Sequence, residues 1–561
     1  MKKFVMICLL LFSITAYAEN YLINGGQETR IDYEMVQQIE PNPAINKLYL
    51  TFVKPTSYQS PTYNQRITNL NFNFIPKPNN QEEYTDKRGN QVIKVVWSEP
   101  RTTIKTIISL TAMNRTVLNE LSTRSTFPLT NLSPDAKQYL TSTEQVPASD
   151  PQIVAKAKEL TAGAKTEFDA VQRILAWVID HMHYVLTPQD YGAMYSFRSG
   201  KGNCQNYSHL SSALMRAVGI PSRVVNGVTL KKPYNVTMGN RILTLKMAEG
   251  RHSWIEVYFE DLGWVPFDPQ QTALFVSNRF IRIEAGLDNN ETTQDGLIRW
   301  TQSEGALATP KFEEVIEASY PQDQVALNAR KQKYGPRKML LVPTVKATFT
   351  RLEVAPEPEP ESIDQDKLQK LTYSNPYLFG NLEFPEDVDF LSSRGPAEKE
   401  GAATYEMKKN FLVETAEYVT SGAQYAQVFV LQKPLKLGKI GLALHKFGGN
   451  GQLWVEIMKD ENGMPGDIIS TSDFIPLDQI PFKSGYFWVD FDFKRDWPVL
   501  SPGRYWIAMG FTGSPIINWF YSYGKPVGPE DGTRYKTVLD TKWSRSLSYE
   551  FNYRVIGLTT P

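Results

Sequence analysis

The apolar residues of this chain change their spacing twice along the sequence, and that change limits the folds open to it. Before about residue 145 they alternate with polar residues, as at Leu48, Leu50 and Phe52, which is typical of strands with one buried face. Between about residues 150 and 220 the spacing becomes helical, and one stripe follows the capping-box sequence that opens at Thr166: Val171, Ile174, Leu175 and Val178. Strand-like alternation returns after Arg223. The sequence therefore predicts an α+β chain whose helices are confined to one central segment.

The length of 561 residues favours three or four domains, at roughly 150 residues each. Alternating prolines and glutamates from Pro356 to Glu361 are typical of an extended linker. We place the boundaries as follows: residues 1–18 a signal peptide, 19–145 an N-terminal β-sandwich, 146–285 a core of helices and strands, 286–404 an extension with the linker, and 405–561 a C-terminal β-sandwich of jelly-roll type.

The N-terminus has the three parts of a secretory signal. Lys2 and Lys3 precede an apolar run over residues 4–12, and Ala16-Tyr-Ala18 matches a cleavage site. The run is shorter than the about 20 residues that a membrane-spanning helix needs. We therefore expect an exported protein, periplasmic or secreted, with no membrane anchor.

The net charge of the chain bears on the kinds of partner that it can bind. The chain carries 60 basic and 60 acidic residues, so it lacks the positive excess that binds phosphate backbones. We expect no nucleic-acid partner.

Cleavage of the signal would remove Cys8 and leave Cys204 as the sole thiol of the mature chain. The sequence Gly200-Lys-Gly-Asn203 before it is typical of a turn, and an apolar stripe after it predicts a helix that begins at Cys204. A helix N-terminus favours a thiolate and can hold an oxyanion on its unpaired N–H groups. An inert buried thiol is the alternative at this point.

Only five histidines occur in the chain, and one of them is placed beside a carboxylate by hairpin geometry. The strand that begins at His252 runs into a turn at Asp261-Leu-Gly263, and a second strand returns to Asp268. A hairpin centred on residues 260–262 brings His252 and Asp268 side by side. A carboxylate at this position fixes the tautomer of a histidine base, although an Asp-Pro turn could equally be structural. His209, within the helix, is expected to be packed or at the surface.

Three phrases occur in the order found in one family. They are Gly202-Asn-Cys204-Gln-Asn-Tyr followed by Arg216-Ala-Val-Gly-Ile-Pro-Ser-Arg223, then Arg251-His252-Ser-Trp-Ile-Glu-Val-Tyr, then Gly263-Trp-Val-Pro-Phe-Asp268-Pro. Together they resemble the transglutaminase-like core, over roughly residues 150–275. Gln270 after Pro269 is a mild departure from the family's Asp-Pro-Thr phrase.

The resemblance implies a papain-like transglutaminase core, with Cys204 as nucleophile, His252 as general base and acid, and Asp268 as the residue that orients His252. It implies attack on an amide of a protein or peptide, release of an amine and a thioester acyl-enzyme, which water or an amine then consumes. No cofactor is implied, and the second oxyanion donor is not identified by the sequence.

Two other functions stay open. A cysteine enzyme of the peptidoglycan amidopeptidase kind also carries Cys on a helix and His on a strand, but its pattern lacks the Gly-Trp-x-x-x-Asp-Pro phrase. A catalytically inactive extracellular binding or scaffolding protein would fit a core flanked by two β-sandwiches.

The C-terminal segment holds six of the eleven tryptophans. Exposed tryptophans stack on sugar rings, so a glycan partner is a further expectation there, although most tryptophans of a sandwich pack in its core. The sequence Asp460-Glu-Asn-Gly463 could hold Ca²⁺ but is more typical of a turn, so calcium stays open and no other metal ligands cluster.

Overall fold

The computed structural model describes most of the chain after residue 19. The described residues are 20–239, 241–246, 249–270, 276–303, 309–332, 340–341, 345–346, 360–382, 394–397, 404–407, 413–414, 416–419, 422–482, 486–522, 532–543 and 545–561. The expected signal peptide lies outside them, as does the expected linker except for Pro360 and Glu361.

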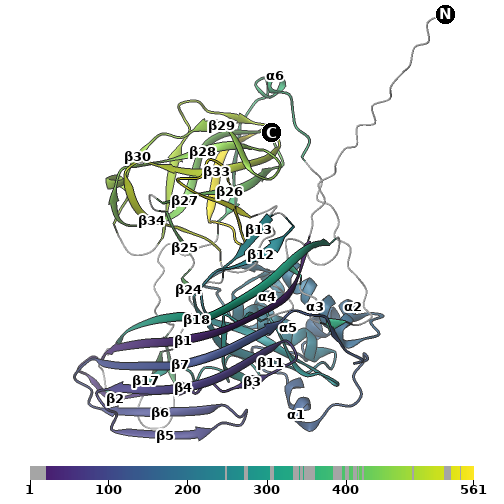
Figure 1. The fold of residues 1–561 in the computed structure, drawn as a ribbon, viewed down its shortest axis with the longest axis vertical. Coiled ribbons are helices and arrows are strands. Elements are labelled where there is room, and N and C mark those ends of the chain that lie inside the picture. Colours follow the sequence, from purple (N-terminus) through teal and green to yellow (C-terminus); the bar gives the residue numbers. More distant parts are fainter. Residues whose placement is uncertain are drawn as a thin grey trace, which may run out of the picture.

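The N-terminal part is built on four long strands, which cross the lower half of Figure 1. Strand β1 (Asn20–Glu40) lies between β7 (Ile104–Val117) and β18 (Lys311–Gln332), and β7 continues to β4 (Tyr63–Ile75). All neighbours in this group are antiparallel. Residues far apart in the sequence, such as Asn20 and Gln332, are therefore direct neighbours.

A second sheet shares a hydrophobic core with these strands. Leu48, Leu50 and Phe52 on its strand β2 (Ile45–Val53) are fully buried, which confirms the alternation expected there. The other strands of the sheet, and the short strands of this part of the molecule, are β6 (Gln91–Ser98), β5 (Asn80–Thr85), β17 (Leu297–Gln302), β22 (Arg394–Ala397), β23 (Thr404–Met407), β3 (Tyr58–Gln59), β8 (Leu121–Ser122), β19 (Leu340–Leu341) and β20 (Val345–Lys346).

The central helices pack around one buried helix, α5 (Cys204–Ala217). Helix α3 (Glu167–His181) begins where the capping sequence predicts, because the Thr166 side chain accepts a hydrogen bond from Asp169 N–H at 3.2 Å. Its predicted apolar stripe is fully buried against α5. The other helices and 3₁₀ turns are α1 (Pro134–Lys137), η1 (Gln138–Leu140), α2 (Pro151–Thr161), α4 (Ala193–Ser199), α6 (Gln365–Leu368) and η2 (Leu477–Gln479).

An antiparallel sheet packs against α5. Its order is β15 (Gly263–Phe267), β14 (Glu249–Phe259), β11 (Ser222–Thr229) and β16 (Phe280–Gly286), and β24 (Val413–Glu414) pairs with the start of β14. Strand β14 is thus held on several sides.

The C-terminal part consists of two further groups of strands around a separate core, at the top of Figure 1. The first group contains β26 (Ala423–Leu431), β28 (Gln452–Asp460), β29 (Pro465–Thr471), β30 (Ile475–Pro476), β33 (Gly503–Phe511), β35 (Thr533–Thr537) and β36 (Arg545–Leu547). The second contains β21 (Asn375–Asn381), β25 (Ala416–Val419), β27 (Leu435–Asn450), β31 (Phe487–Asp492), β32 (Val499–Leu500), β34 (Ser514–Phe520) and β37 (Tyr553–Thr559).

One hairpin joins this part to the centre of the molecule. Strand β13 (Arg241–Leu245) pairs with β36, and its partner β12 (Tyr234–Met238) touches β18. The described chain is mostly β with its long helices confined to the centre, as the sequence predicts, while the classification of the flanking parts as sandwiches and the domain boundaries remain predictions.

Candidate active site

Cys204 is the first residue of helix α5, as the sequence predicts. The helix is capped by Asn203, whose side chain accepts a hydrogen bond from Gln205 N–H at 3.1 Å, while Asn203 N–H donates to Asn206 Oδ1 at 3.1 Å. The N–H of Cys204 itself belongs to the first turn, where a helix offers no internal acceptor. The sulfur therefore lies at the positive end of the helix dipole.

The chain reaches this position through two glycines. Gly200 ends α4 with φ of +67°, a left-handed conformation that glycine adopts at no steric cost. A Cβ at Gly202 would come within 2.3 Å of the Asn206 Cβ, so only glycine allows the capping contact. The glycines of this turn thus fix the entry of the chain into α5.

His252 and Asp268 meet across the β14–β15 hairpin. The hairpin pairs Ile255 with Phe267 and Phe259 with Gly263, so it turns where the sequence predicts. The His252 Nε2 lies 2.8 Å from the Asp268 Oδ2, and both side chains are buried. Asp268 Oδ1 accepts a second hydrogen bond from Gln270 N–H at 3.0 Å. The carboxylate is therefore fixed on both oxygens.

His252 also forms a hydrogen bond with Cys204, which joins the helix to the hairpin. Burial lowers the pKa of His252, but the Asp268 carboxylate and the hydrogen bonds to Asp268 and Cys204 outweigh burial and raise it to about 9. Two aromatic rings also contact the imidazole of His252. The centroid of its ring lies 6.0 Å from that of Trp254 and 5.2 Å from that of Phe280. Cys204, His252 and Asp268, the three residues singled out by the sequence, thus lie in one connected group.

His209 has a structural position. Its Nδ1 lies 2.7 Å from the Tyr191 carbonyl oxygen, and its Nε2 accepts a hydrogen bond from Asn289 N–H at 3.1 Å. Burial lowers the pKa of His209 to about 4, so the ring is neutral. This agrees with the packed role expected for it.

The group at Cys204 is closed off from solvent. Cys204 is 1% exposed, His252 0% and Asp268 1%. Leu186, whose carbonyl accepts a hydrogen bond from Asn203 Nδ2 at 3.4 Å, packs in an apolar cluster with Ala416, Ala443 and Phe520 of the C-terminal part. The C-terminal strands therefore pack against Leu186, which is hydrogen-bonded to the residue that caps α5.

Two tyrosines lie within electrostatic reach of Cys204. Burial and the charge of Cys204 raise the pKa of Tyr184 well above its usual value, and the same two causes raise the pKa of Tyr191. The sequence offered no pattern that would single out either residue.

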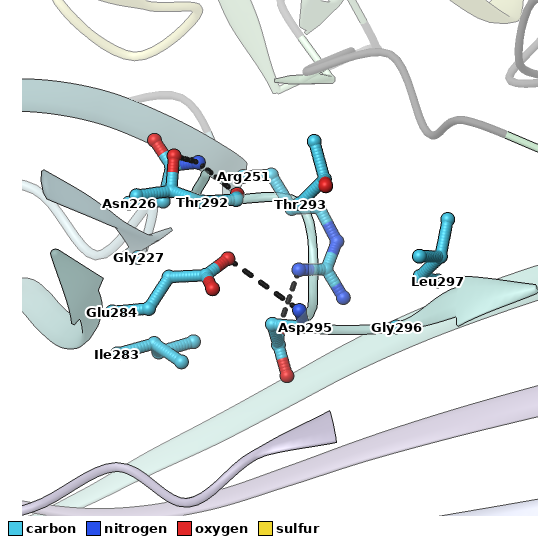
Figure 2. A pocket seen from close by; sticks show the side chains of 10 residues that line it. All are labelled: Asn226, Gly227, Arg251, Ile283, Glu284, Thr292, Thr293, Asp295, Gly296 and Leu297. Atoms are coloured by element: carbon cyan, nitrogen blue, oxygen red, sulfur yellow. Dashed lines mark hydrogen bonds and ion pairs between the residues drawn. The ribbon is translucent and has the colours of Figure 1, made fainter. Parts of the chain in front are cut away.

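A small cavity of about 40 Å³ lies beside the strand that carries His252, and Figure 2 shows the side chains around it. Arg251 Nη1 lies 2.6 Å from Asp295 Oδ2, and Arg251 Nη2 lies 3.2 Å from Glu314 Oε2. Burial lowers the pKa of Arg251, but Glu314 and Asp295 raise it above its usual value. Glu284, across the cavity, is buried near Asp295, and both effects raise its pKa. This network anchors the residue next to His252.

A second buried ion network holds the middle of the same strand. Glu256 accepts from Arg223 at 2.5 Å and from Arg282 at 2.7 Å. Burial raises the pKa of Glu256, but the two guanidinium groups outweigh it and hold the pKa at about 2. Paired charges at this depth fix the register of β14 against β11 and β16.

Within the described ranges, no three His, Cys, Asp or Glu side chains are grouped so as to hold a metal ion. The Asp460 oxygens accept hydrogen bonds from Trp506 Nε1 at 2.7 Å and Gly463 N–H at 3.1 Å.

Helices of the described part are too short or too polar to cross a membrane. Trp506 and Trp519 of the C-terminal part are fully buried, whereas Trp497 is 36% exposed.

Comparison with known proteins finds one family model that matches the segment holding these residues. Residues 154–269 match the model of the Transglutaminase-like superfamily. The uncharacterised protein YebA of Bacillus subtilis is 30% identical over 134 residues, which cover 22% of this chain and 18% of that protein. An uncharacterised protein of Mycobacterium leprae is 32% identical over 89 residues, 16% of this chain and 28% of that one. The match thus spans less than a third of either relative.

The chain also has a weak structural similarity to solved proteins. A proposed cysteine protease from Cytophaga hutchinsonii superposes with a TM-score of 0.40 at 18% identity, over 55% of this chain and 94% of that one. The periplasmic domain of TgpA from Pseudomonas aeruginosa, bound to ethylmercury, gives a TM-score of 0.22 at 14% identity, over 42% of this chain and 89% of that one.

Proposed function

Because residues 154–269 form a transglutaminase-like domain, we propose that this protein is an exported cysteine enzyme that acts on amide bonds of proteins or peptides. The observation that carries the proposal is the position of His252, which contacts Cys204 on one side and Asp268 on the other. A thiol at a helix N-terminus, a base beside it and a carboxylate behind the base are the parts of an activated nucleophile. The signal-like N-terminus supports export.

In the proposed mechanism His252 holds the proton of Cys204, and the thiolate sulfur attacks the carbonyl carbon of the substrate amide. The electron pair of the C=O bond moves to oxygen, and the Cys204 N–H donates to the resulting oxyanion. As the C–N bond breaks, His252 gives its proton to the leaving amine, and a thioester on Cys204 remains.

The second half uses the same groups. His252 takes a proton from water or from an acceptor amine, whose oxygen or nitrogen attacks the thioester carbon. The C–S bond breaks, and the thiolate leaves with its proton supplied again by His252. Water gives hydrolysis or deamidation, and an amine gives a transferred acyl group. Asp268 holds the imidazole in place and stabilises its protonated form throughout.

An inactive binding or scaffolding protein is the second candidate, and the burial of Cys204 at 1% exposure favours it. A substrate the size of a protein needs a path to the sulfur, and the sulfur is buried in this structure.

Mass analysis of the intact full-length protein and of its substrates tests the proposal. Wild type is incubated with candidate peptides and a labelled primary amine. Amine incorporation, a deamidated peptide or a cleaved peptide would each identify one reaction, and Cys204→Ala is the matched control. If wild type and Cys204→Ala give the same products, the enzyme proposal fails and the scaffold remains.

A further inference from the structure

Tyr184 carries a hydroxyl group that can donate a hydrogen bond, and its backbone lies beside Gly202, close to Cys204 along the chain. Tyr184 belongs to the short strand β9 (His183–Tyr184), which pairs in parallel with β10 (Lys201–Gly202) so that Tyr184 lies beside Gly202. Two backbone hydrogen bonds lock this pairing: His183 N–H donates to Gly200 at 2.7 Å, and Val185 N–H donates to Gly202 at 3.0 Å. The backbone of Tyr184 is therefore fixed beside Gly202, which lies two residues before the nucleophile.

The side chain of Tyr184 is directed into the same buried region. Its hydroxyl oxygen is shielded from solvent, and its ring packs against both the helical core and the apolar cluster around Leu186. Burial and the charge of Cys204 both raise the pKa of Tyr184, so the hydroxyl stays protonated. A donor in such a dry environment interacts strongly with nearby negative charge.

We propose that the Tyr184 hydroxyl donates the second hydrogen bond to the oxyanion formed on Cys204, opposite the Cys204 N–H. The inference rests on the proposed function, since it assigns a role in the same acyl transfer. When the sulfur attacks and the C=O pair moves to oxygen, the Tyr184 O–H donates to that oxygen without giving up its proton. When the oxyanion collapses and the leaving group departs, the hydroxyl is unchanged.

Tyr191 is the natural comparison, because Cys204 also acts on it. It lies outside regular structure, before α4, and is less deeply buried than Tyr184. Its backbone carbonyl is held by His209, but no strand pairing fixes its position. The geometry therefore favours Tyr184, and Tyr191→Phe serves as the matched control.

The test uses two reagents that differ in whether an oxyanion forms. Acetyl transfer from p-nitrophenyl acetate to Cys204 passes through a tetrahedral oxyanion, whereas alkylation by iodoacetamide is a direct displacement at carbon and forms none. Both rates are measured at Cys204 in the full-length protein by peptide mass analysis, so that reaction at other side chains is excluded. Cys204→Ala gives the background.

For Tyr184→Phe we expect acetylation of Cys204 to slow by about 100-fold, the usual loss for one oxyanion donor, while alkylation keeps the wild-type rate. Unchanged alkylation shows that the Cys204–His252 pair is intact in the variant. Tyr191→Phe should keep both rates.

Three results would overturn the assignment: unchanged acetylation in Tyr184→Phe, an equal fall of both rates in that variant, or a larger acetylation loss in Tyr191→Phe. Failure of the proposed function would give a different result: wild-type Cys204 would show no acetylation, and it would be alkylated no faster than Cys204 of the His252→Ala variant.

Discussion

The imidazole of His252 and the carboxylate of Asp268 lie 2.8 Å apart at the end of one hairpin, and neither is exposed to solvent. Because Nε2 of His252 faces Asp268, Nδ1 is the ring nitrogen available to Cys204. The order of the three groups sets the effect expected from the loss of each.

Removal of the nucleophile should lower the rate of the amide reaction more than any other single change in the group. Cys204→Ala abolishes the covalent route and leaves only the background from binding and the oxyanion site. His252→Ala should cost nearly as much, since His209 is held by Tyr191 and Asn289 and cannot replace it. The measurement is the rate of the amide reaction identified by mass analysis, and equal activity in Cys204→Ala and wild type would contradict the order.

Asp268→Asn should lower the rate less than either change, because both reacting groups remain. Asp268→Ala should also lower the free energy of unfolding, since it removes the acceptor of Gln270 N–H as well as that of His252. Comparing the two variants by urea unfolding separates orientation of His252 from support of the turn. Equal stability of the two would leave Asp268 with an electrostatic role alone.

Stability should depend on the charge of His252. Its pKa in the folded protein, about 9, lies above the usual value of 6.5, so its contribution is fully present below about pH 6.5. The contribution is lost as the pH rises through 9. Urea unfolding between about pH 6 and 10 should show a larger fall in wild type than in His252→Ala, where other titrating groups are unchanged. Parallel curves would show that the imidazole is neutral.

Arg251 should be a structural residue with a large effect. Arg251→Met leaves Asp295 and Glu314 buried without their cation, which should cost about 3–5 kcal/mol of unfolding free energy. The control is Lys87→Met, which removes an exposed partner of Glu291 at 2.7 Å and should cost less than about 1 kcal/mol. Similar losses in both would show that the Arg251 network is not buried in solution.

The contact between the core and the C-terminal strands should control access to Cys204. Lys246 Nζ lies 2.6 Å from Glu417 Oε1, and both side chains are largely buried. Lys246→Glu places two negative charges together and should separate the parts, so Cys204 should react faster with a bulky maleimide. The double change Lys246→Glu with Glu417→Lys restores the attraction and should restore the slow rate. An equal rate in all three proteins would mean that this contact does not cover the thiol.

Local pattern was sufficient to predict the parts of the site that are close in sequence. The helix that begins at Cys204 and the hairpin that joins His252 to Asp268 depend on caps, turns and periodicity, which are properties of short segments. The cap at Thr166 and the buried faces of residues 48–52 and 171–178 were predictable for the same reason.

The rest depends on distant pairing, which no local pattern encodes. Strand β18 lies along β1, and β36 lies beside β13, across hundreds of residues. Arg251 on β14 meets Glu314 on β18 and Asp295 before β17, and these three residues come together only when the strands assemble. Tyr184 lies beside Gly202 through a two-residue parallel pairing too short to leave a sequence pattern.

The most direct test of the account is the rate of iodoacetamide alkylation at Cys204 in wild type, His252→Ala and Asp268→Asn. A protonated imidazole beside the sulfur favours the reactive thiolate. Wild type should therefore be alkylated fastest of the three at neutral pH, Asp268→Asn more slowly, and His252→Ala slowest. Equal rates in wild type and His252→Ala would contradict the claim that His252 activates Cys204.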